Sequence, residues 1–331
     1  MKKSIADVPG IEVGQAQDSS ALTGVSVIIC RRGAVAGVDQ RGGAPGTRET
    51  DLLNPINLVE KIHAVVLAGG SAFGLDAASG VMKYLEEQKI GFDVRVTRVP
   101  IVPAAVLFDL NLGSAIIRPT AEMGYQAAST ASSAAPAAGN FGAGCGASVG
   151  KLLGNASAMK SGIGSASMDI GGGIIVGALA AVNAFGDVID PATNQIIAGA
   201  RSTSLGPLRL GSSAYFADTL ASLKTVPGRL AEGFSAHSNT VIGVVATNAK
   251  FTKAEASKMA QMAQDGLARV IRPAHTMLDG DTIFAMATGQ KKADVSLVGA
   301  FAAEVFAAAC LNAVRMAGSA GGLPGLADET R

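Results

Sequence analysis

The sequence predicts an α+β fold in which two sheets are covered by helices. Strand-like runs of aliphatic and β-branched residues occur along the chain, separated by segments with helical periodicity. A sheet or helix must bury its apolar face against another layer, so strand pairs with intervening helices indicate stacked sheets with helices outside them. No internal repeat is found in the 331 residues, and we expect one domain over residues 1–331.

The first half of the chain contains short apolar runs that are typical of strands. Four of them predict strands, at Val25–Cys30, Ala34–Val38, Ala64–Leu67 and Ile116–Thr120. The first two would pair around Arg31-Arg-Gly33. The third runs into Gly69-Gly70 and then into a helix near Leu75 to Gln88.

The second half carries the longer elements. Ile174–Asn183 and Val188–Asp190 predict a hairpin, and Thr240–Thr247 and Asp281–Ala287 predict two further strands. Thr252-Lys-Ala-Glu255 is a capping box that begins a helix reaching about Val270.

Two other segments of this half differ in composition. Val295–Met316 is the most hydrophobic long stretch, but it contains Glu304 and Asn312, which favours a buried helix over a membrane span. Arg201–Ser238 is richer in Ser, Gly and charge, and its weak periodicity predicts a loop.

The composition limits the partners of the protein. Charged residues make up 16 % of the chain, against roughly 25 % in typical domains. So few charges leave little with which to cover a surface, and we therefore expect a homo-oligomer. The net charge of +1 indicates neither nucleic acid nor an acidic membrane surface as a partner.

The cysteines and histidines are scattered, at Cys30, Cys145, Cys310, His63, His237 and His275. No pair has the spacing of a metal site, and we expect no metal or other cofactor. An odd number of cysteines suits a reducing compartment, and the N-terminal residues lack the apolar region of a signal peptide. We therefore expect a cytoplasmic protein.

The junction Asn239-Thr240 is the most informative feature of the chain. It begins an apolar, β-branched run, and a strand start is a rigid place to hold a nucleophile. A threonine hydroxyl gains its best base when its own α-amine is free, which requires cleavage of the bond before Thr240. Thr240 is thus a candidate N-terminal nucleophile made by self-cleavage. The alternative is an ordinary strand entry after a turn residue.

Asp279-Gly280-Asp281 lies just before a predicted strand. Residues at i and i+2 of an extended segment share a face, so both carboxylates can point into one pocket. The alternative is a plain Asp-Gly turn.

Two glycine-rich motifs fail as nucleotide sites. Gly146–Lys151 lacks the first glycine of a phosphate loop, where Cys145 stands, and the Ser or Thr after the lysine, where Leu152 stands. Gly142–Ala147 has no clear preceding strand for a dinucleotide fingerprint.

Taken together and in order, these motifs resemble the self-cleaving N-terminal-nucleophile hydrolases of the DmpA-type aminopeptidase and nylon-oligomer (6-aminohexanoate oligomer) hydrolase family. The resemblance covers nearly the whole chain and is carried by Gly37–Gly43, Leu67–Leu75, Gly142–Lys151, Ala181–Gly186, Asn239-Thr240 and Asp279–Asp281. It implies a four-layer αββα sandwich of the DmpA and ornithine acetyltransferase type. It also implies cleavage into a large subunit, 1–239, and a small subunit, 240–331, with a tetramer of cleaved protomers.

The resemblance implies a role for each matching residue. Thr240 matches the nucleophile and Asn239 the new C-terminus, while Lys151 matches an active-site lysine and Asn183 an asparagine that helps to bind the oxyanion. Asp279 and Asp281 match a pair that orients the nucleophile. From the residues alone, Lys151 could equally be a surface lysine and Asn183 a buried structural asparagine.

Two details place the chain within the family. The aminopeptidase branch tends to have Ser as nucleophile and Ser-x-Glu at the acidic pair, so Thr240 with Asp279 and Asp281 leans toward the nylon-hydrolase branch. Phe108 stands where a family tyrosine is expected, and it cannot donate a hydrogen bond. Either the correspondence shifts at that point, or the oxyanion site is built differently.

The resemblance implies a small amide or peptide substrate. The sequence does not choose among peptides, β-peptides, cyclic amides and nylon oligomers. Two other functions stay open: an acyltransferase of the ornithine acetyltransferase type, which also uses a threonine at a cut site, and a non-enzymatic binding or assembly protein, which would remain an intact chain.

Overall fold

The long strand β2 (Thr23–Gln40) connects the two halves of the main sheet. The structure is a computed structural model that describes residues 3–205, 208–210, 215–225 and 239–329. β2 pairs with β4 (Lys61–Ala68) over its first part and with β18 (Thr282–Lys291) over its last part. The predicted pair of strands around Arg31-Arg-Gly33 is therefore wrong, because Gly33, at φ +73°, produces an irregularity within one strand and not a turn.

The sheet has the strand order β10-β11-β16-β18-β2-β4-β7-β3, with β1 paired to β2. Its other strands are β1 (Glu12–Asp18), β3 (Thr47–Arg48), β7 (Ala104–Val106), β10 (Ile163–Asp169), β11 (Ile175–Asn183) and β16 (Thr240–Ala249). β16 and β18 run parallel, as do β4 and β7, and the remaining pairs are antiparallel.

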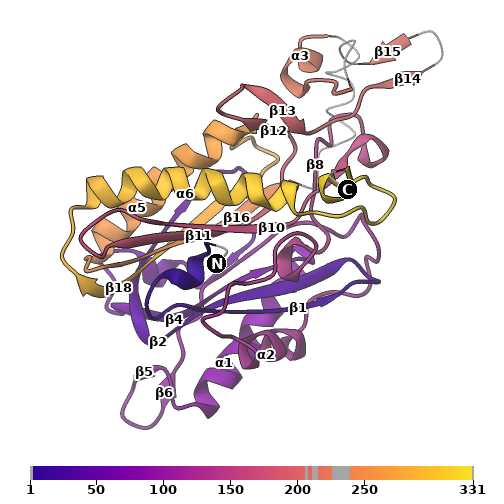
Figure 1. The fold of residues 1–331 in the computed structure, drawn as a ribbon. Helices are drawn as coiled ribbons and strands as arrows, with labels where there is room; N and C mark the ends of the chain where they lie inside the picture. Colours follow the sequence, from indigo (N-terminus) through magenta and orange to yellow (C-terminus); the bar gives the residue numbers. More distant parts are fainter. Residues whose placement is uncertain (1–2, 206–207, 211–214, 226–238, 330–331) are drawn as a thin grey trace.

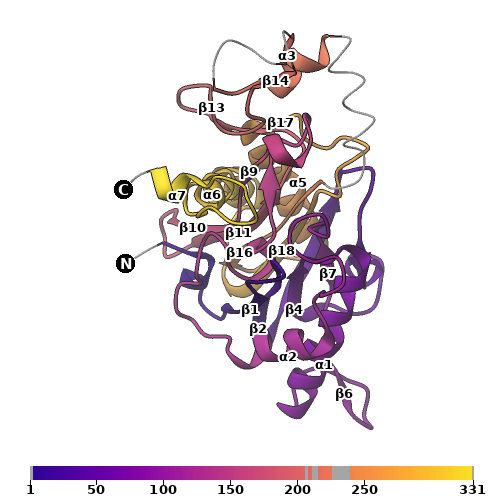
Figure 2. The same cartoon turned by 90° about the vertical axis from the view of Figure 1, so that its right-hand side faces the viewer.

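The sheet forms two stacked layers with a helix layer outside each, as Figures 1 and 2 show. The helices α5 (Lys253–Val270) and α6 (Val295–Arg315) cover one layer, and α1 (Ala77–Glu87) and α2 (Ala121–Ser129) cover the other.

Successive side chains of β16 point into two different apolar cores, which hold the layers together. Val241 and Val245 point into the core beneath α5 and α6, whereas Ile242 and Val244 point into a second core between the two sheet layers. A third core lies between β2, β4 and the helices α1 and α2. Three cores between four layers confirm the αββα sandwich.

The predicted helices are confirmed. Thr252 Oγ1 accepts a hydrogen bond from Glu255 N at 3.3 Å, and Glu255 Oε2 accepts one from Thr252 N at 2.8 Å, which completes the capping box of α5. By length and composition α6 could span a membrane, but 67 % of its most apolar window is buried in the protein. It packs against α5, β10 and β11 as a core helix.

Two further predictions are wrong, one of a strand and one of a pairing. Ile116–Thr120 is not a strand, and the Ile116 side chain is 86 % exposed, so its apolar character does not report burial. β11 and β12 (Asp187–Asp190) do not form a hairpin, because β10 and β16 already occupy both edges of β11. β12 belongs instead to a separate small sheet.

The remaining elements are short. The small sheets contain β12 with β13 (Gln195–Ala198) and β17 (Ile271–Arg272), β5 (Phe92–Asp93) with β6 (Arg98–Val99), β8 (Ser148–Val149) with β9 (Met159–Lys160), and β14 (Thr203–Leu205) with β15 (Leu208–Leu210). Two short helices, α3 (Thr219–Leu223) and α7 (Leu326–Glu329), complete the set. The predicted loop 201–238 thus contains β14, β15 and α3, and its residues 206–207, 211–214 and 226–238 lie outside the described ones.

The capping box predicts the effect of a conservative pair of substitutions. Thr252→Ala removes the oxygen that accepts from Glu255 N and should lower the free energy of unfolding by about 1 kcal/mol, whereas Thr252→Ser keeps the oxygen and should lose only a fraction of that. Urea titration of the two variants beside the parent tests this. Equal loss in both variants would show that the methyl group, and not the cap, matters.

Candidate active site

Residues that are far apart in the sequence meet at one edge of the sheet, where β11 ends and where β16 and β18 begin. Asn183, the last residue of β11, lies directly opposite Thr240, the first residue of β16. On the other side of β16, Asn239 forms a parallel bridge with Asp279, and Gly280 N donates to Asn239 O at 3.2 Å. The sheet therefore places Asn183, Thr240 and the acidic pair side by side, although the sequence separates them by up to about one hundred residues.

Thr240 lies at a cavity of about 320 Å³. The cavity is lined by Ala44, Pro45, Gly46, Ser71, Ala72, Val106, Leu107, Phe108, Asn239, Thr240 and Leu278. Thr240 Oγ1 donates a hydrogen bond to Asn239 O, the carbonyl oxygen of the bond that self-cleavage would break. A Cβ atom on Gly280 would lie 2.9 Å from Thr240 Oγ1, so a side chain there would press on the hydroxyl.

Asp281 holds the start of β16 through the main chain. Its Oδ1 accepts from Val241 N at 2.8 Å, and its Oδ2 accepts from His275 N at 3.0 Å. The His275 ring also lies on this carboxylate, with Nδ1 2.9 Å from Oδ2. Asp281 therefore fixes the residue after Thr240 and does not bind its hydroxyl.

Asp279 is held by Thr276, whose N and Oγ1 donate to its Oδ2 at 2.8 and 2.5 Å. Burial and then the nearby Asp281 carboxylate raise the pKa of Asp279 to about 6, against the lowering effect of the Thr276 hydrogen bonds and of Lys151. Among the described contacts, neither carboxylate of the pair forms a hydrogen bond with the Thr240 side chain.

Lys151 and Asn183 form a buried pair beside this edge. Lys151 Nζ donates to Asn183 O at 2.9 Å and to Asn183 Oδ1 at 2.7 Å, and Ser148 N donates to the same Oδ1 at 3.0 Å. Burial lowers the pKa of Lys151 to about 7, although the carboxylates of Asp279 and Asp109 oppose this shift. Lys151 is 2 % exposed, which excludes the reading as a surface lysine.

Phe108 contributes its main-chain carbonyl oxygen to the hydrogen bonds of the site. Asn183 Nδ2 donates to Phe108 O at 2.8 Å, which fixes the orientation of the carboxamide. The next residue, Asp109, accepts from Gly70 N at 2.7 Å and from Thr23 Oγ1 at 2.8 Å. These contacts hold the glycine turn after β4 against the cavity, where Ser71 stands at φ +54°.

The glycine motif after β4 lets the main chain of the turn come close to the Asp109 side chain. A Cβ atom on Gly69 would lie 2.0 Å from Asp109 Oδ2, so only glycine allows this carboxylate to reach the turn.

His275 is a site residue that the sequence does not single out. In the sequence it is one of three scattered histidines, yet it contacts Asp281 through both its main chain and its ring. Its distance of six residues from Asp281 was the available signal. Among the described residues no cluster of three or more His, Cys, Asp or Glu side chains could hold a metal.

The pKa of Lys151 predicts how stability depends on pH. Its folded value, about 7, lies below the roughly 10.4 of an unfolded lysine, so between these values the unfolded chain binds more protons. The free energy of unfolding should therefore rise with pH above 7, by at most about 1.4 kcal/mol per pH unit for this group. Below pH 7 this contribution should no longer change.

The test is urea titration of the parent and Lys151→Met between about pH 7 and pH 9. The variant should show a shallower rise. Some rise should remain, because burial also lowers the pKa of Lys160 to about 7. Identical slopes would contradict a neutral Lys151 in this range.

Comparison with known proteins identifies the family of the chain. The model of peptidase family S58 matches residues 3–327. An uncharacterized aminopeptidase of Mycobacterium leprae is 42 % identical, over 97 % of this chain and 92 % of its own length. A 6-aminohexanoate-oligomer endohydrolase of a Kocuria species is 30 % identical, over 93 % of this chain and 85 % of its own length.

A solved structure shares the fold. The L-aminopeptidase D-Ala-esterase/amidase of Ochrobactrum anthropi, described as a variant of the Ntn hydrolase fold, matches with a TM-score of 0.70 at 17 % identity, over 97 % of this chain and 88 % of that chain. By identity, this chain is more similar to the mycobacterial protein than to the Kocuria endohydrolase. The leaning toward nylon hydrolases thus rests on Thr240, Asp279 and Asp281 alone. The chain belongs to peptidase family S58, and it is a hydrolase of amide bonds.

Proposed function

We propose that this chain is a self-processing N-terminal threonine amidohydrolase that cleaves short amide oligomers or peptides through an acyl-enzyme on Thr240. The observation that carries the proposal is the position of Thr240. It begins β16 between Asn183 and the acidic pair, it lines a cavity, and its hydroxyl lies on the carbonyl of Asn239.

The first stage is self-cleavage. Thr240 Oγ1 attacks the carbonyl carbon of Asn239, the C–N bond breaks, and the proton passes to the departing nitrogen. The product is an ester between Asn239 and the Thr240 hydroxyl, with a free α-amine on Thr240. Water then hydrolyses the ester and leaves subunits 1–239 and 240–331.

The second stage is turnover. The α-amine of Thr240, with an ordinary pKa of about 7.7–8.0, is partly neutral near pH 7 and can take the hydroxyl proton. Thr240 Oγ1 attacks a substrate amide, the amine leaves with that proton, and water hydrolyses the acyl-enzyme. Neither stage needs a cofactor.

The surrounding residues have separate roles in this proposal. Asp281 fixes Val241 N, and so the direction of the nucleophile. Asp279 supplies a negative charge that stabilises the ammonium formed when the α-amine takes the hydroxyl proton. Asn183 Nδ2 donates to Phe108 O, which fixes the direction of the carboxamide, and in this proposal the carboxamide helps to bind the oxyanion. Lys151 orients Asn183 and, when charged, favours the neutral form of the Thr240 amine.

The assembly and location are also proposals. The low content of charge, with large apolar side chains such as Ile116 and Met277 exposed at 86 and 79 %, supports a homo-oligomer, for which we propose a tetramer of cleaved protomers. We further propose a cytoplasmic location, from the odd number of cysteines, all of which are free and buried.

Thr240 predicts the products of self-cleavage. Mass spectrometry of the purified protein should show fragments 1–239 and 240–331, and sequencing of the smaller one should begin Thr-Val-Ile-Gly. Thr240→Ala should abolish both processing and amide hydrolysis, whereas Thr240→Ser, which keeps hydroxyl and amine, should retain part of each. An intact parent chain with full activity, or an active alanine variant, would sink the proposal.

If Asp279 and Asp281 position the nucleophile, changing either should affect self-cleavage and turnover more than thermal stability. Asp281→Asn keeps the shape but weakens the acceptor for Val241 N and His275 N, so the fraction cleaved over time and the turnover should fall far more than the melting temperature. Asp279→Asn should act in the same direction. Asp265→Asn, an exposed carboxylate on α5, is the matched control. If both pair variants mature and turn over like this control, the pair is only a turn before β18.

The proposed role of Asn183 as an oxyanion donor predicts how far turnover falls when its carboxamide is removed. Asn183→Ala should reduce turnover by about 10²–10³, the usual range for one lost donor. Because its Oδ1 also accepts from Ser148 N and Lys151, circular dichroism must first show that the variant is folded. Unaltered turnover of a folded variant would make Asn183 a structural residue.

A further inference from the structure

We propose a second binding site, for a small organic anion, at the start of β4. The cavity at Thr240 lies near the other end of that strand. The ligand class is an oxyanion head group, carboxylate or phosphate, on an apolar body. The site is a cavity of about 650 Å³, within the range of roughly 300–1,000 Å³ that small-molecule sites occupy. The proposal does not depend on the mechanism at Thr240.

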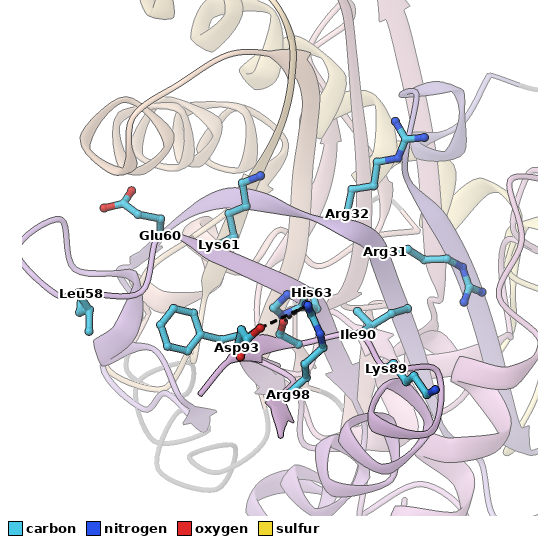
Figure 3. Close-up of a pocket in the computed structure, with 12 residues that line it drawn as sticks. Arg31, Arg32, Leu58, Glu60, Lys61, His63, Lys89, Ile90, Asp93 and Arg98 are labelled. Carbon is cyan, nitrogen blue, oxygen red and sulfur yellow. Dashed lines mark hydrogen bonds and ion pairs between the residues drawn. The ribbon is translucent and has the colours of Figure 1, made fainter. Parts of the chain in front are cut away.

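The cavity lies between β2, β4 and the β5–β6 hairpin, as Figure 3 shows. It is lined by Arg31, Arg32, Leu58, Glu60, Lys61, His63, Lys89, Ile90, Gly91, Phe92, Asp93 and Arg98. In the figure, Arg32 and Lys61 lie on one side of His63, and Arg98 and Lys89 lie on the other. Cations therefore surround the cavity from several elements.

The charges at this cavity are not balanced by their neighbours. Arg31 pairs with Glu12 at 2.9 Å, and Arg98 pairs with Asp93 at 3.5 Å. The remaining lining cations, Arg32, Lys61 and Lys89, have no ion-pair partner among the described residues, and Glu60 is the one lining carboxylate that is left for them. The excess of positive charge gives the cavity a potential that attracts anions.

His63 supplies a donor from a buried ring that lines the cavity, and it makes the cavity more than a charged surface. Its side chain is only 7 % exposed, and its Nδ1 accepts a hydrogen bond from Ile101 N at 3.2 Å. A neutral ring that accepts at Nδ1 carries its hydrogen on Nε2. Nε2 has no hydrogen-bond partner among the described residues, so a donor without an acceptor lines the cavity. An oxyanion is the acceptor that this donor and its neighbouring cations fit.

The electrostatics around His63 keep the ring neutral in the absence of a ligand. Burial first, and then the cations Lys61 and Arg98, lower the pKa of His63. An anion on Nε2 would offset the two cations and so raise this pKa. Occupancy of the site can therefore be read from the titration of one residue.

The apolar lining indicates an organic ligand. Phe92, Ile90 and Leu58 contribute carbon surface beside the cations, and Leu58 is 82 % exposed. A ring or alkyl chain attached to the head group would cover this surface. Inorganic phosphate should bind by its charge alone, and more weakly.

The site is separate from the cavity at Thr240. β4 begins at Lys61 and ends at Ala68, immediately before the glycine turn that adjoins Ser71. Eight residues in a strand span on the order of 20 Å. The two cavities share no lining residue.

The test is titration of the purified protein with phenyl phosphate, benzoate and inorganic phosphate at about 0.15 M salt, where exposed charges are largely screened. The two aromatic anions distinguish a phosphate from a carboxylate head group. Binding is measured by calorimetry and by the NMR titration of His63 with and without ligand. We expect saturable binding of at least one aromatic anion, tighter than inorganic phosphate, and a raised pKa of His63 in its presence.

The variants separate a built site from surface charge. Arg32→Gln combined with Lys61→Gln removes two exposed cations from the cavity and should weaken binding at least about tenfold, which is 1.4 kcal/mol. Lys83→Gln, an exposed lysine of α1 outside the cavity, is the matched control and should bind like the parent. His63→Gln should also weaken binding, with the double variant as the safeguard if it does not fold.

Three results would overturn the proposal. These are the absence of saturable binding by all three anions, equal weakening in Lys83→Gln and in the double variant, and binding that leaves the titration of His63 unchanged. Binding of a polyanion such as a single-stranded oligonucleotide without binding of any small anion would overturn the ligand class. Loss of Thr240 activity would leave all these measurements unaffected, so the two proposals fail independently.

Discussion

The pairing of β16 with β11 on one edge and with β18 on the other is the constraint on which the site depends. Because β16 begins at Thr240, its antiparallel register with β11 places Asn183 opposite Thr240, and its parallel register with β18 places Gly280 beside it. Successive residues of a strand face opposite layers, so a slip of one residue would turn Thr240 to the other face of the sheet. The two apolar cores on either side of β16 prevent that slip.

The protein has few charged residues, but four of them are buried near the start of β16. Lys151, Asp109, Asp279 and Asp281 are each at most 2 % exposed. Burial raises the pKa of Asp279 and Asp109 and lowers that of Lys151. Their contacts with fixed donors and acceptors offset part of this cost. The groups are thereby held in place before a substrate arrives, which is what positioning a nucleophile requires.

The sequence predicted best those elements whose signal is local. β16, α5 and α6 carry long apolar or periodic patterns and a capping box, and each was found close to its expected bounds. The errors concern pairing over distance. Gly33 resembles a turn residue but lies inside the long strand β2, where β4 and β18 hold the chain extended on both sides of it. The expected hairpin after β11 failed because β10 and β16 had taken both of its edges.

The acidic pair and Asn183 could be predicted as candidates because they stand at the ends of strong strand signals, and the resemblance named their roles. Their partners could not be predicted. His275 carries no pattern of its own, since it contacts Asp281 only because the chain turns back at φ +59°. At Phe108 the contact that the structure shows is likewise made by the main chain. Its side chain cannot donate, but its carbonyl accepts from Asn183 whatever the side chain is.

Most contacts that hold the site are made by the main chain. The donors or acceptors include Val241 N, His275 N, Thr276 N, Ser148 N and Phe108 O. Such contacts depend on the path of the backbone and survive a change of the side chain that stands at the same position. That path is what this chain shares, at a TM-score of 0.70, with a structure to which it is only 17 % identical. A site held in this way constrains few side chains beyond the reacting ones, so the fold can be kept while the walls of the cavity, and with them the substrate, are free to change.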